Sequence, residues 1–275
     1  MSSENDGVSV VAVNFPAYDL ARAVCGAENV SMLLPPGAES HSYEPTAQDI
    51  LRIQESDLFI YTGGESDAWV ERILASLDRA VNTLKMTDFV SLIEIDEHDA
   101  EYDEHVWTSP VNAAAITNAI KSALCDMDSA NKKMYEKNAQ KYIEEINALD
   151  SDFRAFFDTV DNKSLIFGDR FPLIYFTEEY GIEYHAAFPG CAEHSEPSAS
   201  DIAELMRMMQ DENISDIYYI EFSDRNIAES LAEAGNAETH IFYTCHNVSK
   251  EQFDSGATYV SLMRENLEML KGTMQ

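Results

Sequence analysis

Short apolar runs rich in β-branched residues alternate with amphipathic stretches along the first 127 residues. The apolar runs have the length and composition of buried strands, and the stretches between them have helical periodicity. The predicted strands are residues 8–15, 30–34, 57–61 and 89–95, and the predicted helices are 17–24, 47–56, 67–78 and 109–124. Continuous apolar strands separated by helices indicate a parallel sheet covered by helices on both faces.

A stretch without Gly or Pro runs from Asp128 to Val160. Its apolar residues recur at spacings of three and four, which places them on one helical stripe. These residues are Tyr135, Ala139, Tyr142, Ile146, Leu149, Phe153, Phe156 and Val160. A helix of this length would span ~50 Å at ~1.5 Å per residue. We therefore expect a strut that runs along two domains.

The alternation of strands and helices resumes after residue 160. The predicted strands are 164–168, 183–188, 216–221 and 240–243, and the predicted helices are 171–180, 198–211, 224–233 and 253–271. The predicted fold class is α/β, with two parallel-sheet lobes joined by one long backbone helix. The expected boundaries are 1–127 for the N-terminal lobe, 128–160 for the helix and 161–275 for the C-terminal lobe.

The two predicted lobes share a loop motif. Residues 41–50 (HSYEPTAQDI) are similar to residues 194–202 (HSEPSASDI). In both, Glu-Pro followed by Thr or Ser leads into a predicted helix. Thr and Ser are good N-caps, and Pro disfavours helix in the residue before it. The repeat favours two similar lobes with a cleft between them.

The charge balance narrows the range of partners. Hydrophobic residues make up 45% of the 275, and 18 Lys and Arg against 50 Asp and Glu give a net charge of −32. So acidic a surface repels nucleic acid and anionic lipid, so neither is an expected partner. A solvated or salt-adapted surface is the simplest explanation of most of this charge, and only a few carboxylates can bind at one site.

No apolar run reaches the ~18 residues of a transmembrane helix. Residues 1–7 are polar and contain no signal-peptide core, so we expect either a cytosolic protein or an exported one whose signal has been removed. The four cysteines (Cys25, Cys125, Cys191 and Cys245) form no CxxC pair, which disfavours a cysteine-rich zinc site. Their even number permits disulfides without requiring them.

Three histidines and one aspartate lie in loops that follow predicted strands: His41, His105, Asp169 and His246. Open α/β sheets bind ligands at the carboxyl ends of their strands, so we expect these side chains to face one cleft. Three imidazoles and one carboxylate form a tetrahedral donor set suited to Zn²⁺. For Asp169 an ion pair with the adjacent Arg170 is the structural alternative.

The grounds for the other four histidines are weaker. His98 lies in the acidic run 96–104, which is either a solvated loop or a place of transient cation capture. His194 mirrors His41 in the repeated motif, although the helix-entry motif alone can explain that similarity. His185 and His240 fall within predicted strands, where we expect packing roles.

Five segments occur in a specific order along nearly the whole chain. They are 36–46 (PGAESHSYEPT), 63–67 (GGESD), 103–110 (DEHVWTSP), 175–181 (YFTEEYG) and 196–199 (EPSA). Together they resemble the metal-binding ABC-transporter solute-binding proteins of the zinc and manganese group, the cluster A-I type. The resemblance implies two α/β lobes, one long backbone helix and a metal site in the cleft.

The resemblance matches His41 to the first metal ligand of the family and His105 to the second. Zinc-selective members often carry an acidic, His-rich loop before the second ligand, to which the short run 96–104 is similar. The third ligand, usually His or Glu, falls in residues 168–172. Asp169 is the only carboxylate there, and it is one residue out of register.

The fourth ligand of the family, often Asp, falls near residues 244–246. We select His246, which would supply a third imidazole, with the thiolate of Cys245 as the alternative. Exported members fold in an oxidising compartment, so we favour a Cys191–Cys245 disulfide over a thiolate ligand.

These residues and the resemblance predict a binding protein and not an enzyme. We expect a monomeric extracytoplasmic protein, periplasmic or lipid-anchored, that captures Zn²⁺ and delivers it to a membrane ABC permease. Mn²⁺ or iron would be favoured if two carboxylates, such as Asp169 and Glu221, both bind. The alternatives are a metal-dependent hydrolase, although no HExxH pair exists, and an adhesin or scaffold with a structural metal.

Overall fold

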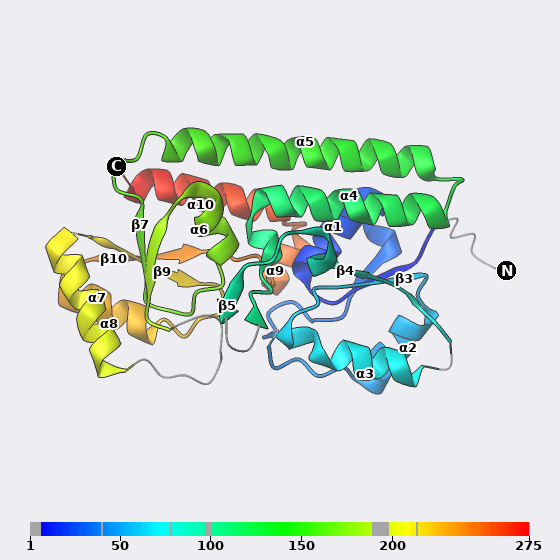
Figure 1. Ribbon diagram of the computed structural model, residues 1–275, viewed down its shortest axis with the longest axis horizontal. Coiled ribbons are helices and arrows are strands. Elements are labelled where there is room, and N and C mark those ends of the chain that lie inside the picture. The colour runs from blue at the N-terminus through cyan, green and yellow to red at the C-terminus, as the bar shows by residue number, and fades with distance from the viewer. Residues whose placement is uncertain are drawn as a thin grey trace. The chain divides into compact units, whose positions relative to one another are not determined.

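The computed structural model describes residues 7–39, 41–77, 79–96, 101–188, 198–212 and 214–274. The density of internal contacts divides the chain into two units. Unit 1 comprises Met1–Asp150 and Cys245–Val260, and unit 2 comprises Ser151–Thr244 and Ser261–Gln275. Each unit contains one four-stranded parallel sheet flanked by helices, which confirms the predicted pair of parallel-sheet α/β lobes (Figure 1).

The sheet of unit 1 has the strand order β2-β1-β3-β4, and each neighbouring pair is parallel. Its strands are β1 (Val10–Ala12), β2 (Val30–Met32), β3 (Leu58–Tyr61) and β4 (Asn82–Lys85). The two central strands, β1 and β3, are buried throughout, as their continuous apolar sequences require.

Helices cover both faces of this sheet. They are α1 (Phe15–Cys25), α2 (Ala47–Glu55), α3 (Ala68–Ser76) and α4 (Pro110–Met127). Ile53 of α2 and Trp69 of α3 pack on Phe59 and its same-face neighbours in the sheet. In Figure 1, α1 and α4, which contact each other, lie above the sheet, and α2 and α3 lie below it.

The expected strand at residues 89–95 is wrong. The fourth strand of the sheet is β4, and residues 94–96 instead form β5 (Glu94–Asp96), which pairs antiparallel with β6 (Glu101–Tyr102). The error has a physical cause, because β4 is an edge strand that buries only Leu84 and so shows little apolar pattern. Phe89 and Ile95, which produced the apolar pattern, are 46% and 49% exposed.

The long helix is α5 (Lys132–Phe157), with 26 residues. It starts four residues after the predicted position, because Asp128 organises a turn instead. The Asp128 carboxylate accepts hydrogen bonds from the backbone N–H of Asn131 and the hydroxyl of Tyr135, at 3.2 and 2.8 Å. Residues 132–150 belong to unit 1 and the remainder of the helix to unit 2.

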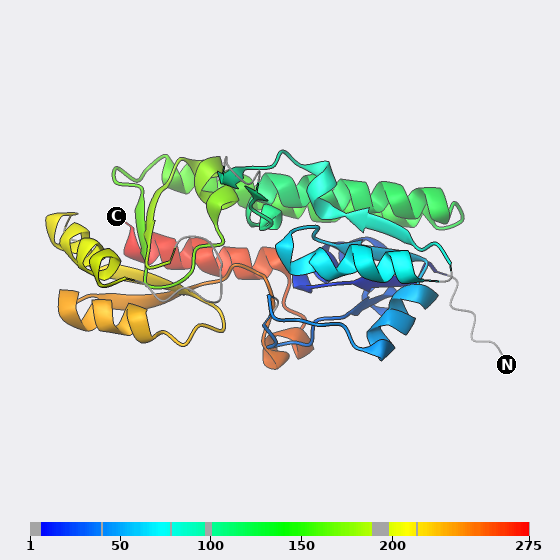
Figure 2. The same cartoon turned by 60° about the horizontal axis from the view of Figure 1, so that its bottom comes forward.

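The sheet of unit 2 has the order β10-β9-β7-β8, again parallel. Its strands are β7 (Ser164–Phe167), β8 (Glu183–Ala186), β9 (Asp216–Ile220) and β10 (Glu238–Phe242). Helices α7 (Ala199–Glu212) and α8 (Asn226–Gly235) cover one face and lie side by side, yellow and orange in Figure 2. Phe176 of α6 (Ile174–Tyr180) packs against Phe242 on the other face.

The chain returns to unit 1 through residues 245–260 before it ends in unit 2. This return segment contains α9 (Lys250–Asp254) and leads into α10 (Tyr259–Thr273), so the single helix predicted at 253–271 is two. Gly256, with φ of 79°, separates them. Among the helices in the described part of the chain, none is both long enough and apolar enough to cross a bilayer.

Candidate metal site

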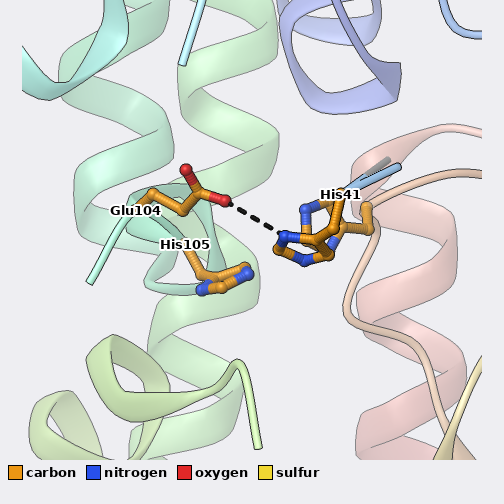
Figure 3. Close-up of side chains that lie close together, drawn as sticks. His41, Glu104 and His105 are labelled. Carbon is orange, nitrogen blue, oxygen red and sulfur yellow. Dashed lines mark ion pairs between the residues drawn. The ribbon is translucent and has the colours of Figure 1, made fainter. Parts of the chain in front are cut away.

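Four side chains with metal-binding atoms converge in unit 1: His41, Glu104, His105 and His246. One ligand atom from each lies within 4.8 Å of all the others. Figure 3 shows Glu104 pointing toward His41, beside His105. His246 joins the group because it lies in the return segment, residues 245–260, which belongs to unit 1. Three of the four residues that the sequence predicted as ligands are therefore brought together.

The three imidazoles pack against one another. The ring centroids of His105 and His246 are 4.8 Å apart, those of His41 and His246 are 5.0 Å apart, and those of His41 and His105 are 5.8 Å apart. His105 is 2% exposed and His246 is 9% exposed. Metal ions bind the neutral form of imidazole, and the close packing of these rings brings one ligand atom from each to a common place.

His41 is held by the loop that leads from β2 to α2. Thr46 caps α2, and a capping box with Asp49 fixes its first turn. On the other side of His41, the side-chain amide of Asn247 donates hydrogen bonds to the carbonyl oxygens of Pro35 and Ala38, both at 2.8 Å. The loop of His41 is thereby tied directly to the residue that follows His246.

His105 is oriented by its neighbour Asp103. One carboxylate oxygen of Asp103 accepts the backbone N–H of His105 at 2.8 Å and lies 3.0 Å from its Nδ1. A carboxylate at Nδ1 favours the tautomer with the proton there, which directs Nε2 toward a metal and makes it a better donor. The ring of buried Trp107 lies 5.5 Å from that of His105 and forms an apolar wall.

His246 follows a residue in an unusual backbone conformation. Cys245 has φ of 61°, in the left-handed region that a non-glycine residue seldom adopts. Its neighbour Thr244 is held by Glu221, whose carboxylate accepts the backbone N–H and the hydroxyl of Thr244 at 2.7 and 2.6 Å. The segment after β10 therefore begins at a residue fixed by Glu221 and passes through the strained Cys245, and His246 comes directly after it.

A second buried carboxylate adds negative potential near the cluster. Burial raises the pKa of Asp67 to about 7, and the hydrogen bond from the Gly63 N–H opposes that rise. The charge of Glu104 raises the pKa further, whereas His41 lowers it. Glu104 thus raises the proton affinity of Asp67, and a cation between two such carboxylates would be favoured.

Asp169, the fourth predicted ligand, is not a member of this cluster. It lies in unit 2 after β7 and is 6% exposed. Its two carboxylate oxygens accept the backbone N–H groups of Arg170 and Ile220, at 2.8 and 3.1 Å. These hydrogen bonds give Asp169 a structural task, and its role as a metal ligand stays a prediction.

Glu104 is the member of the cluster that the sequence did not single out. It stands in the run Asp103-Glu104-His105, directly before a predicted ligand and at the end of an acidic loop. Its position next to His105 was the only feature of the sequence that could have suggested it as a ligand. The other acidic residues of the run 96–104 are of the same type, so the sequence does not distinguish Glu104 from them. The approach of Glu104 to His41 depends on tertiary structure.

Of the four other histidines, two lie on strands and two lie outside the residues that the structure describes. His185 lies on β8 and His240 on β10, as predicted, and His240 Nε2 is 2.8 Å from a carboxylate oxygen of Asp216. His98, Cys191 and His194 lie outside the described residues, so the predicted Cys191–Cys245 disulfide and the loop around His98 stay predictions.

The chain is similar in sequence and fold to known proteins. The family model of ZnuA, described as the periplasmic component A of a zinc-uptake complex, matches residues 10–273. This chain belongs to the ZnuA family. The match confirms the resemblance seen in the sequence and extends through both units.

Named relatives include two proteins of zinc uptake or binding. The high-affinity zinc uptake system protein ZnuA of Bacillus subtilis is 31% identical over 99% of this chain and 89% of its own length. The zinc-binding lipoprotein AdcA of Streptococcus pneumoniae is 31% identical over 97% of this chain, but the match covers only 56% of AdcA. The chain thus spans about half the length of that relative.

Solved structures have the same fold. The Zn(II)-bound ZnuA-like domain of Streptococcus pneumoniae AdcA is 30% identical, with a TM-score of 0.83 over 98% of this chain and 99% of that domain. A Mn-bound periplasmic metal-binding protein from Candidatus Liberibacter asiaticus is 25% identical, with a TM-score of 0.84 over 98% of this chain and 100% of that protein.

Proposed function

We propose that this protein captures a divalent metal ion outside the cytoplasm and delivers it to the membrane permease of an ABC importer. The ion that we propose is Zn²⁺. The observation that carries the proposal is the convergence of His41, His105 and His246 with one carboxylate in unit 1. The names of the ZnuA and AdcA relatives support capture and uptake of zinc.

The chemistry of the donors favours zinc. Imidazole nitrogen suits Zn²⁺, and three imidazoles with one carboxylate satisfy its tetrahedral preference. Mn²⁺ prefers more oxygen donors, so it is the second candidate, supported by the Mn-bound relative. A competition between the two ions separates these alternatives.

The proposed role is binding and not catalysis. A catalytic zinc site keeps one position open for water, whereas four protein donors fill a tetrahedral site. A closed site suits a cargo ion that must be held and later released. The net charge of −32 agrees with a cation as cargo. We also propose that the protein acts as a monomer.

The test is a metal titration of the purified protein after removal of bound metal with a chelator. We expect one equivalent of Zn²⁺ to bind, Zn²⁺ to outcompete Mn²⁺, and His41→Ala to weaken binding strongly. His185→Ala, on strand β8 of unit 2, is the matched control and should bind like the unaltered protein. Absence of stoichiometric metal binding would contradict the proposal, and preference for Mn²⁺ would contradict the zinc assignment.

A further inference from the structure

The geometry points to Glu104 as the carboxylate ligand of the metal, positioned by a glycine turn at residues 63–67, so that unit 1 alone supplies a full set of four donors. This inference rests on the proposed metal-binding function. It assigns the carboxylate to a residue that the sequence did not select and to a different unit from Asp169.

The two oxygens of Glu104 have different surroundings. Oε1 lies 3.6 Å from Nδ1 of His41, within the cluster of donors. Oε2 accepts the backbone N–H of Ser66 at 3.1 Å. One oxygen is thus anchored to the protein while the other faces the imidazoles, which is the arrangement expected of a ligating carboxylate with an outer-shell hydrogen bond. Glu104 is only 6% exposed, so a cation would compensate its buried charge.

Gly64 makes the room for this carboxylate. A Cβ atom on Gly64 would lie within 3.0 Å of Oε2, Cδ and Cβ of Glu104, closer than real Cβ atoms come to such neighbours. The φ of Gly64 is −104°, which any residue can adopt. Space and not backbone freedom is therefore the reason for a glycine here, and a methyl group would have to displace Glu104.

Asp67 stabilises the turn that contains Gly64. One of its carboxylate oxygens accepts the backbone N–H groups of Thr62 and Gly63, at 2.7 and 3.1 Å. Gly63 has φ of 97°, so the turn needs a glycine at this position too. The segment Gly63-Gly64-Glu65-Ser66-Asp67 is thus a rigid support for one oxygen of Glu104, and Gly64 and Ser66 act as positioning residues.

Asp169 is the competing carboxylate, and its contacts are of another kind. Both of its oxygens already accept backbone amides within unit 2. To bind a metal, one of its oxygens would have to use its second lone pair while the first accepts a hydrogen bond. Glu104 can bind through Oε1 while Oε2 keeps its own hydrogen bond, so the donor set needs no change of partners.

The experiment compares Glu104→Gln with Asp169→Asn, two matched changes of carboxylate to amide, in the full chain. The affinity for Zn²⁺ is measured by competition with a chromophoric chelator, and the Co²⁺-loaded proteins are compared by visible absorption. Loss of an outer-shell partner typically weakens metal affinity roughly 10–100-fold. We expect Glu104→Gln to lose at least about tenfold and to change the Co²⁺ spectrum, and Asp169→Asn to change neither.

Gly64→Ala tests the same point without altering the carboxylate. It should weaken Zn²⁺ binding and change the Co²⁺ spectrum. The Tm of the metal-free protein should fall too, because the added methyl group also overlaps Cβ of Glu104, so the Co²⁺ spectrum is the measurement that separates displacement of Glu104 from general destabilisation. Gly64→Ala also decides the matter if Glu104→Gln does not fold.

Two results would overturn the inference: a folded Glu104→Gln protein that binds Zn²⁺ as tightly as the unaltered chain, or a larger loss of affinity from Asp169→Asn at unchanged Tm. Failure of the unaltered chain to bind Zn²⁺ at all would instead contradict the proposed function. The two failures are therefore distinguishable.

Discussion

Oδ1 of Asp103 lies 3.0 Å from Nδ1 of His105, and this contact sets which ring nitrogen is available to a metal. Asp103→Asn removes the charge but keeps the size of the side chain. We expect the affinity for Zn²⁺ to fall roughly tenfold, within the range usual for such partners. Chelator competition measures the change. Asp126→Asn, at an exposed position on α4, is the control and should have no effect.

A second prediction concerns Asn247, which ties the loop of His41 to the return segment. Asn247→Ala leaves the carbonyl oxygens of Pro35 and Ala38 without this donor. The two partly buried hydrogen bonds contribute about 0.5–1.5 kcal/mol each to the unfolding free energy, which the variant should lose. We expect weaker Zn²⁺ binding as well, because two ligand loops lose their connection. Urea unfolding and metal titration are the measurements. Unchanged stability, with exposed Asn118→Ala as the control, would contradict this reading.

The raised pKa of Asp67 predicts how the stability of the metal-free protein depends on pH. Burial raises this pKa from 3.8 to about 7, so the folded state binds the proton more tightly than the unfolded state. The corresponding stability is fully present below about pH 4 and is lost as the pH rises through about 7. The shift corresponds to an upper bound on the order of 4 kcal/mol.

Asp67→Asn should remove this component and flatten the profile between about pH 4 and pH 7. Asparagine keeps one oxygen, and both backbone N–H groups already bind a single oxygen of Asp67, so the hydrogen bonds of the turn can persist. Urea unfolding of the metal-free protein at several pH values tests the prediction. Asp88→Asn, at an exposed position, should leave the profile as it is. An identical profile for Asp67→Asn would show that another group causes the dependence.

The affinity for metal should fall at acid pH. Imidazoles must be neutral to bind, and histidine ordinarily titrates near pH ~6.5. We expect the affinity for Zn²⁺ to fall at least about tenfold between about pH 7.5 and 5.5. A site made only of carboxylates would keep its affinity over that interval, because Asp and Glu titrate near pH ~4. Titrations at three pH values distinguish the two cases.

Much of the fold could be predicted from the sequence, because buried parallel strands carry continuous apolar runs. Three strands of unit 1 followed from that pattern, and the long helix α5 followed from apolar residues spaced three and four apart, in both cases apart from the exact ends. The edge strand β4 did not, since only one of its four residues is buried. Residues 89–95 have the apolar sequence pattern of a buried strand, although Phe89, Leu92 and Ile95 are exposed.

The metal site, like the fold, could be predicted only in part from the sequence. His41, His105 and His246 could be selected because they follow strands and because imidazole is a typical zinc ligand. Glu104 could not, because what distinguishes it from its acidic neighbours is the space above Gly64 and the N–H of Ser66. These features are formed by residues about 40 positions away and appear only when the chain is folded.

The return segment has a consequence for the order in which the site is made. His41 and His246 are more than 200 residues apart, and His246 is the last of the four clustered donors to be synthesised. A nascent chain that ends before residue 245 offers two imidazoles and one carboxylate, too few donors for closed tetrahedral coordination. High-affinity loading is thus postponed until residues 245–260 have been synthesised and have folded as part of unit 1. Incomplete chains would then sequester little metal during their own biosynthesis.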